Sequence, residues 1–335
     1  MNFDTIREYA KFIRLKSMGI STIAVFGALS VRGSLELWHF LVLLIIGVFF
    51  NILGFVLNDI VDLDLDKQSK ELSERPLVKG TVTKRNATMI IFICYIFIFC
   101  LGLFFFRDIV PFSVLVLSVV FGSLYDVWGK RFLGSDFALS GSIAFFCLFG
   151  ALTVSREIGS FTIIIVTIIF YHVLFFNIIE GGFKDADNDR KSGVKTTAVY
   201  SRVETGARIH IPKIFIIFAF VIESISTFFV FLPFVIIPAV YNFQYWYIQM
   251  IILIMFIFLI FLSIIKMFTL SSFNRRKVRN IITFQEIKRY IITSVLLMSV
   301  AGILWSAALI VIPIVWHLLF SFIMFHKPFS PSTML

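Results

Sequence analysis

Residues 58–66 carry four side chains whose oxygen atoms could do chemistry together. Asn58, Asp62 and Asp66 lie four residues apart, so a helix through them places all three on one face, with Asp59 beside them. Carboxylates this close repel one another unless positive charge lies against them. Hard oxygen ligands suit Mg²⁺, which binds one or two carboxylates together with substrate phosphates. The segment therefore predicts a magnesium and phosphate site.

A second acidic segment repeats this spacing. Asp185 and Asp189 lie four residues apart at an expected helix end, and they follow residues 58 and 62 by the same number of positions. Arg202 follows Arg75 by that number as well. We therefore expect two related halves, about residues 1–135 and 136–270, followed by C-terminal helices in one membrane domain of residues 1–335.

Basic residues follow both acidic segments, which favours a diphosphate as ligand. Mg²⁺ would bridge carboxylate and phosphate oxygens, while cationic side chains contact the remaining oxygens. If the diphosphate leaves an allylic prenyl chain, aromatic ring faces can stabilise the resulting carbocation. Mg²⁺ and basic side chains can stabilise the negative charge that develops on the departing diphosphate. The candidate cations are Arg75, Lys79, Lys130 and Lys195.

The elements that must position these segments are long apolar stretches. Of 335 residues, 59% are hydrophobic and only 15% charged, whereas soluble domains have about a quarter charged. This excludes a soluble domain and predicts an all-α integral membrane protein with about nine transmembrane helices. Pro313 lies in the last span, where a proline bends or ends a helix, so that span is one kinked helix or two. The spans are expected at about 17–31, 37–57, 87–106, 109–124, 137–154, 161–179, 214–240, 246–270 and 290–325.

The basic residues also predict the orientation. Most of the 30 Lys and Arg residues lie on one side of these spans, which the positive-inside rule places in the cytoplasm together with both acidic segments. The net charge of +10 thus indicates topology and anionic lipid, with no nucleic-acid partner. Residues 1–16 have the apolar spacing of an amphipathic helix at the membrane interface. The cluster 275–277 is expected to anchor lipid headgroups.

Four segments of the chain resemble a known family. The run from Asn58 to Asp66 resembles the NDxxDxxxD signature of the UbiA superfamily of intramembrane prenyltransferases, and Asp185-x-x-x-Asp189 is similar to its second motif. The resemblance covers roughly residues 10–310. It implies nine helices around a central cavity, a prenyl diphosphate donor bound through Mg²⁺, and transfer of the prenyl group to an acceptor. Further similar segments are Arg75-Pro76-Leu77 with Gly80, and Tyr125 with Lys130-Arg131.

The resemblance implies roles for individual residues in an enzyme of the cell membrane whose active-site loops face the cytoplasm. No obligatory protein partner is predicted. The expected catalytic residues are Asp62, Asp66, Asp185 and Asp189, which with Asn58 are also the expected metal ligands. The expected substrate-binding residues are Asn58, Asp59, Arg75, Lys79, Tyr125, Lys130, Lys195 and Asn177.

The acceptor is less well indicated. An aromatic quinone precursor is favoured because it needs only an electron-rich ring, and a prenylated glycerol phosphate of archaeal-type lipid is the alternative. The family often has Arg-Pro-x-Asn before the first span, with its Asn on the acceptor side, whereas this chain has Arg14-Leu15-Lys16-Ser17.

An EF-hand and an ion-coupled transporter are the alternatives to a magnesium and phosphate site. An EF-hand is rejected, because its sixth position would be Lys67 instead of Gly and its twelfth Ser73 instead of Glu. An ion-coupled transporter remains the alternative from a different class, since carboxylates within a membrane often mark ion paths. Glu223 is the main carboxylate inside a span, and we expect it to be paired or to face the cavity.

Overall fold

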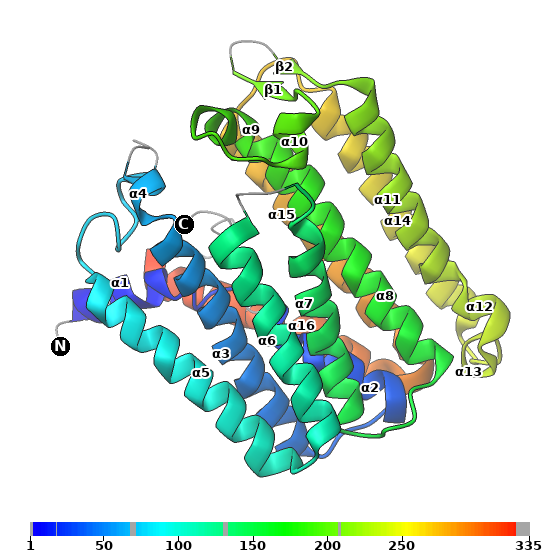
Figure 1. The fold of residues 1–335 in the computed structure, drawn as a ribbon. Helices are drawn as coiled ribbons and strands as arrows, with labels where there is room; N and C mark the ends of the chain where they lie inside the picture. Colours follow the sequence, from blue (N-terminus) through cyan, green and yellow to red (C-terminus); the bar gives the residue numbers. More distant parts are fainter. Residues whose placement is uncertain (1–2, 18, 68–71, 130–132, 207–208, 326–335) are drawn as a thin grey trace.

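The chain folds into a bundle of long helices (Figure 1). The computed structural model describes residues 3–17, 19–67, 72–129, 133–206 and 209–325. Regular structure outside helices is limited, in these residues, to two paired strands of two residues each, β1 and β2. The longer helices are α2 (Ile23–Arg32), α3 (Leu37–Val61), α5 (Lys84–Phe106), α6 (Ile109–Trp128), α7 (Asp136–Leu152), α8 (Ser160–Phe175), α11 (Lys213–Phe231), α14 (Trp246–Phe268), α15 (Arg275–Leu296) and α16 (Met298–Phe325). The shorter elements are α1 (Phe3–Phe12), η1 (Ile20–Thr22), α4 (Leu63–Asp66), η4 (Phe176–Gly181), α9 (Gly182–Lys191), α10 (Thr197–Tyr200), β1 (Glu204–Thr205), β2 (Ile209–His210), α12 (Pro233–Ile236) and α13 (Pro238–Tyr241).

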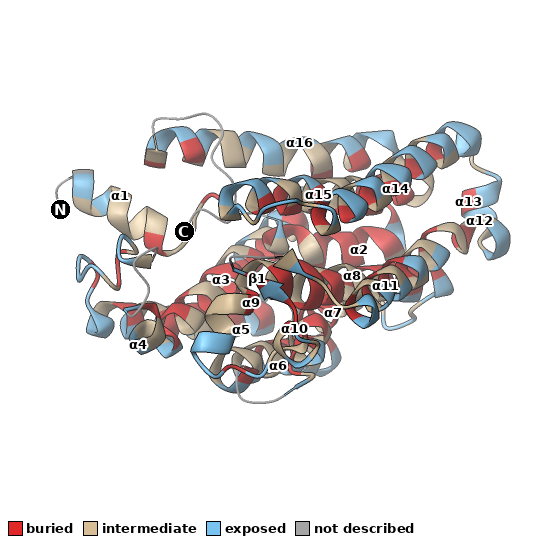
Figure 2. Cartoon of the chain, turned by 90° about the horizontal axis from the view of Figure 1, so that it is seen from above, coloured by how far each residue is buried: buried red, intermediate tan, exposed pale blue. Residues whose placement is uncertain are grey.

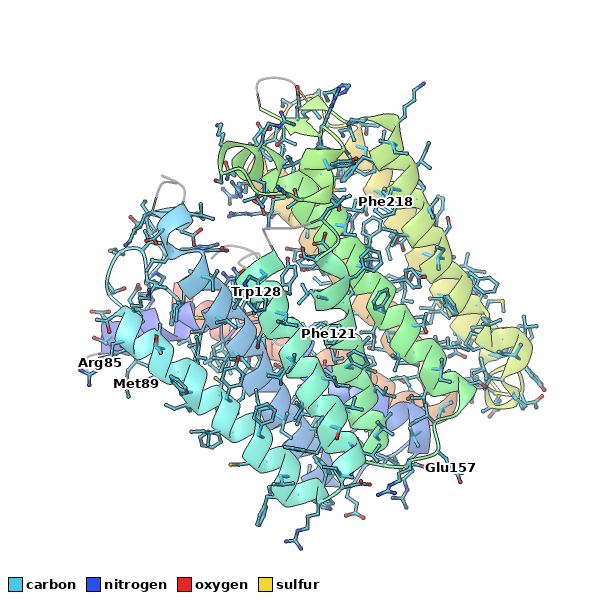
Figure 3. All side chains as sticks on the ribbon, viewed as in Figure 1. Arg85, Met89, Phe121, Trp128, Glu157 and Phe218 are labelled. Carbon is cyan, nitrogen blue, oxygen red and sulfur yellow. The ribbon has the colours of Figure 1, made fainter. Side chains whose placement is uncertain are left out.

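A helix is present in each predicted span. In the described residues, seven helices are long and apolar enough to cross a membrane, and two apolar helices, Ile20–Arg32 and Asp136–Leu152, are shorter. Apolar side chains cover the outer surface of the bundle, where Met89 on α5 is 52% exposed and Leu304 on α16 is 82% exposed. Figure 3 shows Met89 pointing away from the neighbouring helices. Such a surface is stable in lipid, so the chain is a multi-pass membrane protein.

The break in the last predicted span corrects the sequence-based expectation. Helix α15 ends at Leu296, α16 begins at Met298, and Gly302 has non-helical angles of φ 80° and ψ 166°. Pro313 instead lies within α16 without ending it. Glycine tolerates a positive φ without steric cost, so the chain turns there and not at the proline.

Glycines allow α2 and α7 to pack closely against each other. A Cβ on Gly27 of α2 would lie 1.8 Å from the Cys147 carbonyl oxygen, and one on Gly150 of α7 would lie 1.8 Å from the Ala24 carbonyl oxygen. Small residues let membrane helices approach in this way. Figure 2 shows buried residues concentrated where α2, α7 and α8 meet. The contact fixes α7, which contributes polar residues to the site.

Both acidic segments lie at one end of the bundle. Helix α4 follows α3, and α9 follows α8 through η4, and both appear at the upper end of the view in Figure 1. The predicted amphipathic segment is helix α1, whose Arg7 Nε donates to the Met324 carbonyl at 2.6 Å. The N-terminal helix is therefore held against the end of α16.

Candidate active site

The two acidic segments open onto a single cavity of about 1020 Å³. Its wall combines a polar mouth, formed by these segments, with apolar residues from the inner faces of α2, α3, α7 and α8. This size fits a drug-sized or lipid-like ligand. The residues predicted for the site that line the cavity are Asn58, Asp62, Asp66, Arg75, Tyr125, Asn177, Asp185 and Asp189.

The first motif keeps helical spacing across a break between α3 and α4. Asp62 adopts φ −83° and ψ −4° at this break, and its N–H still donates to the Asn58 carbonyl at 2.9 Å. The Asp66 N–H donates to the Asp62 carbonyl at 2.8 Å. The four-residue spacing therefore brings all three side chains to the same side of the chain, as the sequence predicted.

Two arginines neutralise part of the first motif. Arg75 Nη1 donates to Asp66 Oδ2 at 2.5 Å and to Asp59 Oδ1 at 3.3 Å, and Arg14 Nη2 donates to Asp59 Oδ1 at 2.9 Å. Burial raises the pKa of Asp66, and Arg75 offsets only part of that effect. Asp59 is buried behind the cavity wall, where it orients both guanidinium groups. Its role in the structure is thus to position Arg14 and Arg75.

The second motif follows a π-helical turn. The π-helix Phe176–Gly181 shifts the register between α8 and α9, and such turns occur often at functional sites. Asp185 on α9 accepts from Arg275 Nη2 at the start of α15 and from Lys184 Nζ at 3.2 Å. The expectation that Arg275 only anchors lipid headgroups is therefore wrong, because the residue lines the cavity and pairs with Asp185. The sequence did not indicate this pairing, because Arg275 lies far along the chain from both acidic motifs.

The predicted lysines are not gathered at the cavity. Lys79 is exposed and pairs with Glu74 at 3.3 Å, so the structure does not place it at the site. Lys195 is also exposed and lines a smaller neighbouring pocket that includes Asp62. Lys130 lies outside the described residues. Arg202, the counterpart of Arg75 in the proposed repeat, is exposed as well, with φ 62°.

A polar network that sequence reasoning only partly found joins the end of α6, the start of α7 and η4. Asn177 Nδ2 donates to the Tyr125 hydroxyl at 2.8 Å and to Asp136 Oδ1 at 2.7 Å. Asp126 and Asp136 both line the cavity and were missed, because each is an isolated acid with no spacing partner. Asp126 directly follows Tyr125 in the sequence, whereas the fold brings Asp136 to Asn177.

A buried ion-pair cluster joins the cavity to the rest of the bundle. Arg289 donates to Glu180 Oε1 at 2.5 Å and to Glu223 Oε2 at 3.0 Å, and its guanidinium lies 4.2 Å from the centre of the Phe175 ring. Arg289, which lines the cavity, is 4% exposed. The expectation that Glu223 is paired is confirmed. The cluster ties α15 to η4 and α11.

The donor atoms at the mouth fit a diphosphate with Mg²⁺. Arg75 Nε is buried and has no hydrogen-bond partner in the described part of the chain, so it can donate to an anionic oxygen. No three His, Cys, Asp or Glu side chains among the described residues are close enough to hold a metal unaided. Mg²⁺ characteristically combines one or two carboxylates with substrate phosphates, which these separate carboxylates can provide. Asn58, Asp62 and Asp66 would hold it on one side, and Asp185 and Asp189 on the other.

Comparison with known proteins supports the same assignment. Residues 19–267, well over half of the chain, match the UbiA prenyltransferase family. The digeranylgeranylglyceryl phosphate synthase of Sulfolobus acidocaldarius is 26% identical over 205 residues, 58% of this chain and 70% of that protein. The 4-hydroxybenzoate octaprenyltransferase of Legionella pneumophila (strain Lens) is 30% identical over 162 residues, 46% of this chain and 53% of that one.

Solved structures share the fold. A structure described as digeranylgeranylglyceryl phosphate synthase in membranes matches with a TM-score of 0.63 and 19% identity, over 90% of this chain and all of that one. A UbiA homologue from Archaeoglobus fulgidus bound to geranyl diphosphate (GPP) and Mg²⁺ matches with a TM-score of 0.60 and 15% identity, over 87% of this chain and 99% of that one. The fold, the cavity and the family match agree: this chain belongs to the UbiA prenyltransferase family and is a membrane-embedded prenyltransferase.

Proposed function

We propose that the enzyme transfers a prenyl group from an allylic polyprenyl diphosphate to a lipophilic acceptor that enters the cavity from the membrane. The observation that carries the proposal is the single cavity onto which both acidic segments open. Its polar mouth suits a diphosphate, and its apolar wall suits a prenyl chain. The ion-coupled transporter is set aside, because the family consists of prenyltransferases.

The residues at the mouth of the cavity bind different parts of the prenyl diphosphate donor. Arg75 binds diphosphate oxygens through the donors that Asp59 and Asp66 do not use, and Arg275 and Lys184 act from the opposite side beside Asp185. Mg²⁺, when bound, supplies positive charge where the departing diphosphate becomes more negative. The Tyr125 ring lies at the cavity wall, where an aromatic face stabilises positive charge on the prenyl chain.

The favoured acceptor is an aromatic quinone precursor. Support comes from the relatives that carry the name 4-hydroxybenzoate octaprenyltransferase, among them that of Legionella pneumophila (strain Lens) at 30% identity. Arg14 and Lys16 line the cavity near its mouth and could bind the carboxylate of such an acceptor. We further propose that the mouth faces the cytoplasm, as the distribution of basic loops predicts.

A prenylated glycerol phosphate is the second candidate acceptor. The specific observation in its favour is coverage: the match to the digeranylgeranylglyceryl phosphate synthase spans 70% of that protein, against 53–66% for the five relatives named 4-hydroxybenzoate octaprenyltransferase. The same basic side chains could bind its phosphate. Both candidates therefore share an anionic group and differ in the nucleophilic atom.

The experiment is a transfer assay with the purified protein. Detergent-solubilised enzyme is incubated with Mg²⁺, radiolabelled geranylgeranyl diphosphate and either 4-hydroxybenzoate or geranylgeranylglyceryl phosphate, and lipid products are separated. We expect a labelled product with one acceptor, its loss in EDTA and its recovery with added Mg²⁺. Product formation that survives strict chelation would contradict the metal and diphosphate assignment, and absence of product and of Mg²⁺-dependent donor binding would contradict the function.

A further inference from the structure

The carboxylate of Asp136 has no part in the donor site just described. It lines the cavity, is 8% exposed and is the first residue of α7. No Lys, Arg or His in the described residues forms an ion pair with it, whereas Asp66 and Asp185 are each held by an arginine. A buried carboxylate without a cation is costly to keep, so its presence at a reaction cavity calls for a function.

The position of Asp136 is where donor and acceptor would meet. One face of α7 lines the cavity through Asp136, Leu139 and Ile143, which are spaced as on a single helix face. The carboxylate thus lies at the outer end of an apolar stripe, between the polar mouth and the lipid-like interior. A prenyl diphosphate that places its head at the mouth and its chain along this interior would bring its C1 atom to this boundary.

The orientation of Asp136 is fixed by its neighbours. Asn177 Nδ2 donates to Asp136 Oδ1 at 2.7 Å and to the Tyr125 hydroxyl at 2.8 Å, and Asn177 is itself held in the π-helix η4. Asn177 thus holds the carboxylate through Oδ1, at a residue that lines the cavity. A carboxylate held in this way is preorganised to take a proton.

We propose that Asp136 accepts the proton that the acceptor loses during prenyl transfer, and that Asn177 is its positioning residue. This inference rests on the proposed function. The C1–O bond of the donor breaks and its electron pair leaves with the diphosphate. The nucleophilic carbon or oxygen of the acceptor forms the new bond to C1, and the proton it releases moves to the Asp136 carboxylate. No further reactant is needed.

Asp126 is another carboxylate that lines the cavity outside the acidic motifs, and its surroundings differ. It also lines the smaller pocket that contains Asp62 and Lys195, so it lies on the side of the first acidic motif. The diphosphate and its metal ion are expected on that side. In the described residues Asp126 has no amide that orients it as Asn177 orients Asp136. The geometry therefore favours Asp136.

The test separates bond cleavage in the donor from proton removal. Asp136→Asn is nearly isosteric and can still accept from Asn177 through its amide oxygen, but it cannot take the proton. We expect transfer to fall about 100-fold or more, as for loss of a general base. Cleavage should persist, and it is followed without acceptor as movement of ¹⁸O from the bridging to a non-bridging position of geranylgeranyl diphosphate. Asp136→Glu keeps a carboxylate and should retain more transfer than Asp136→Asn.

Two further variants complete the comparison. Asp108→Asn, at the Asp108–Arg156 ion pair and at the opposite end of α6 from Tyr125, should leave transfer unchanged. Asn177→Ala should lower kcat and shift the acidic limb of the profile of kcat against pH. The reason is that the Asp136 carboxylate loses the hydrogen bond that orients it. Wild-type transfer in Asp136→Asn, or a large loss found only in Asp126→Asn, would overturn the proposal.

The remaining outcomes also decide the matter. Loss of ¹⁸O movement together with transfer in Asp136→Asn would mean that the residue serves donor binding or folding, and equal loss in Asp136→Asn and Asp136→Glu would argue against a proton acceptor. A wild-type protein that moves ¹⁸O but yields no product with either acceptor would overturn the acceptor assignment. If it does neither, the proposed function itself fails.

Discussion

Removing Arg289 should destabilise the protein strongly, because two buried carboxylates depend on it. Glu180 is 0% exposed and Glu223 is 2% exposed, and Arg289 donates to both. Breaking a buried ion pair from one side costs about 3–5 kcal/mol, since the remaining charge stays buried and uncompensated. Arg289→Ala leaves two such groups and removes the stacking on Phe175, so we expect a loss at or above that range. Each 1.4 kcal/mol corresponds to about a tenfold change in the unfolding equilibrium.

The matched control removes all three charges together. A triple variant, Arg289→Met with Glu180→Gln and Glu223→Gln, leaves no uncompensated charge and should recover most of the lost stability, as replacement of buried ion pairs often does. The assay is equilibrium unfolding by a denaturing detergent in micelles, followed by circular dichroism. If Arg289→Ala stays within about 1 kcal/mol of the wild type, or if the triple variant is as unstable as the single one, the reasoning is refuted.

Three further predictions concern the mouth of the cavity. Asp62→Asn and Asp189→Asn should each abolish prenyl transfer while expression and helicity stay near wild type, and full activity in either variant would contradict the diphosphate site. Arg75→Ala should reduce donor binding in a radioligand assay by tenfold or more, while Lys79→Ala, exposed outside the cavity, should change it less than twofold; equal effects would count against the observed geometry. Burial and the nearby Arg14 lower the pKa of Lys16 to about 8, below its ordinary 10.5. The unfolded chain therefore binds more protons between these values, so the unfolding free energy should rise from pH 8 to 10.5 in the wild type relative to Lys16→Met, and parallel curves would exclude the shifted pKa.

Apolar length predicted the bundle but not where its helices break. Each predicted span contains a helix, because a stretch that long and apolar is stable in lipid only with its backbone hydrogen bonds satisfied internally. The helical geometry is broken instead at Gly302, inside α16, where φ is 80°, and not at Pro313. Local sequence preferences predicted which segments are helical, but they did not predict the position of this turn.

The spacing of the acidic residues determined which carboxylates lie on the same face of a helix. The tertiary structure determined which cationic side chains contact them. Asp62 and Asp66 share a face because residues four apart in a helix must do so. Arg275 reaches Asp185, and Asn177 reaches Asp136, because separate helices pack side by side, which no local pattern encodes. The spacing of residues along one helix follows directly from the sequence. Contacts between helices depend on the whole packed bundle, and that physical difference separates what the sequence alone determined from what the fold decided.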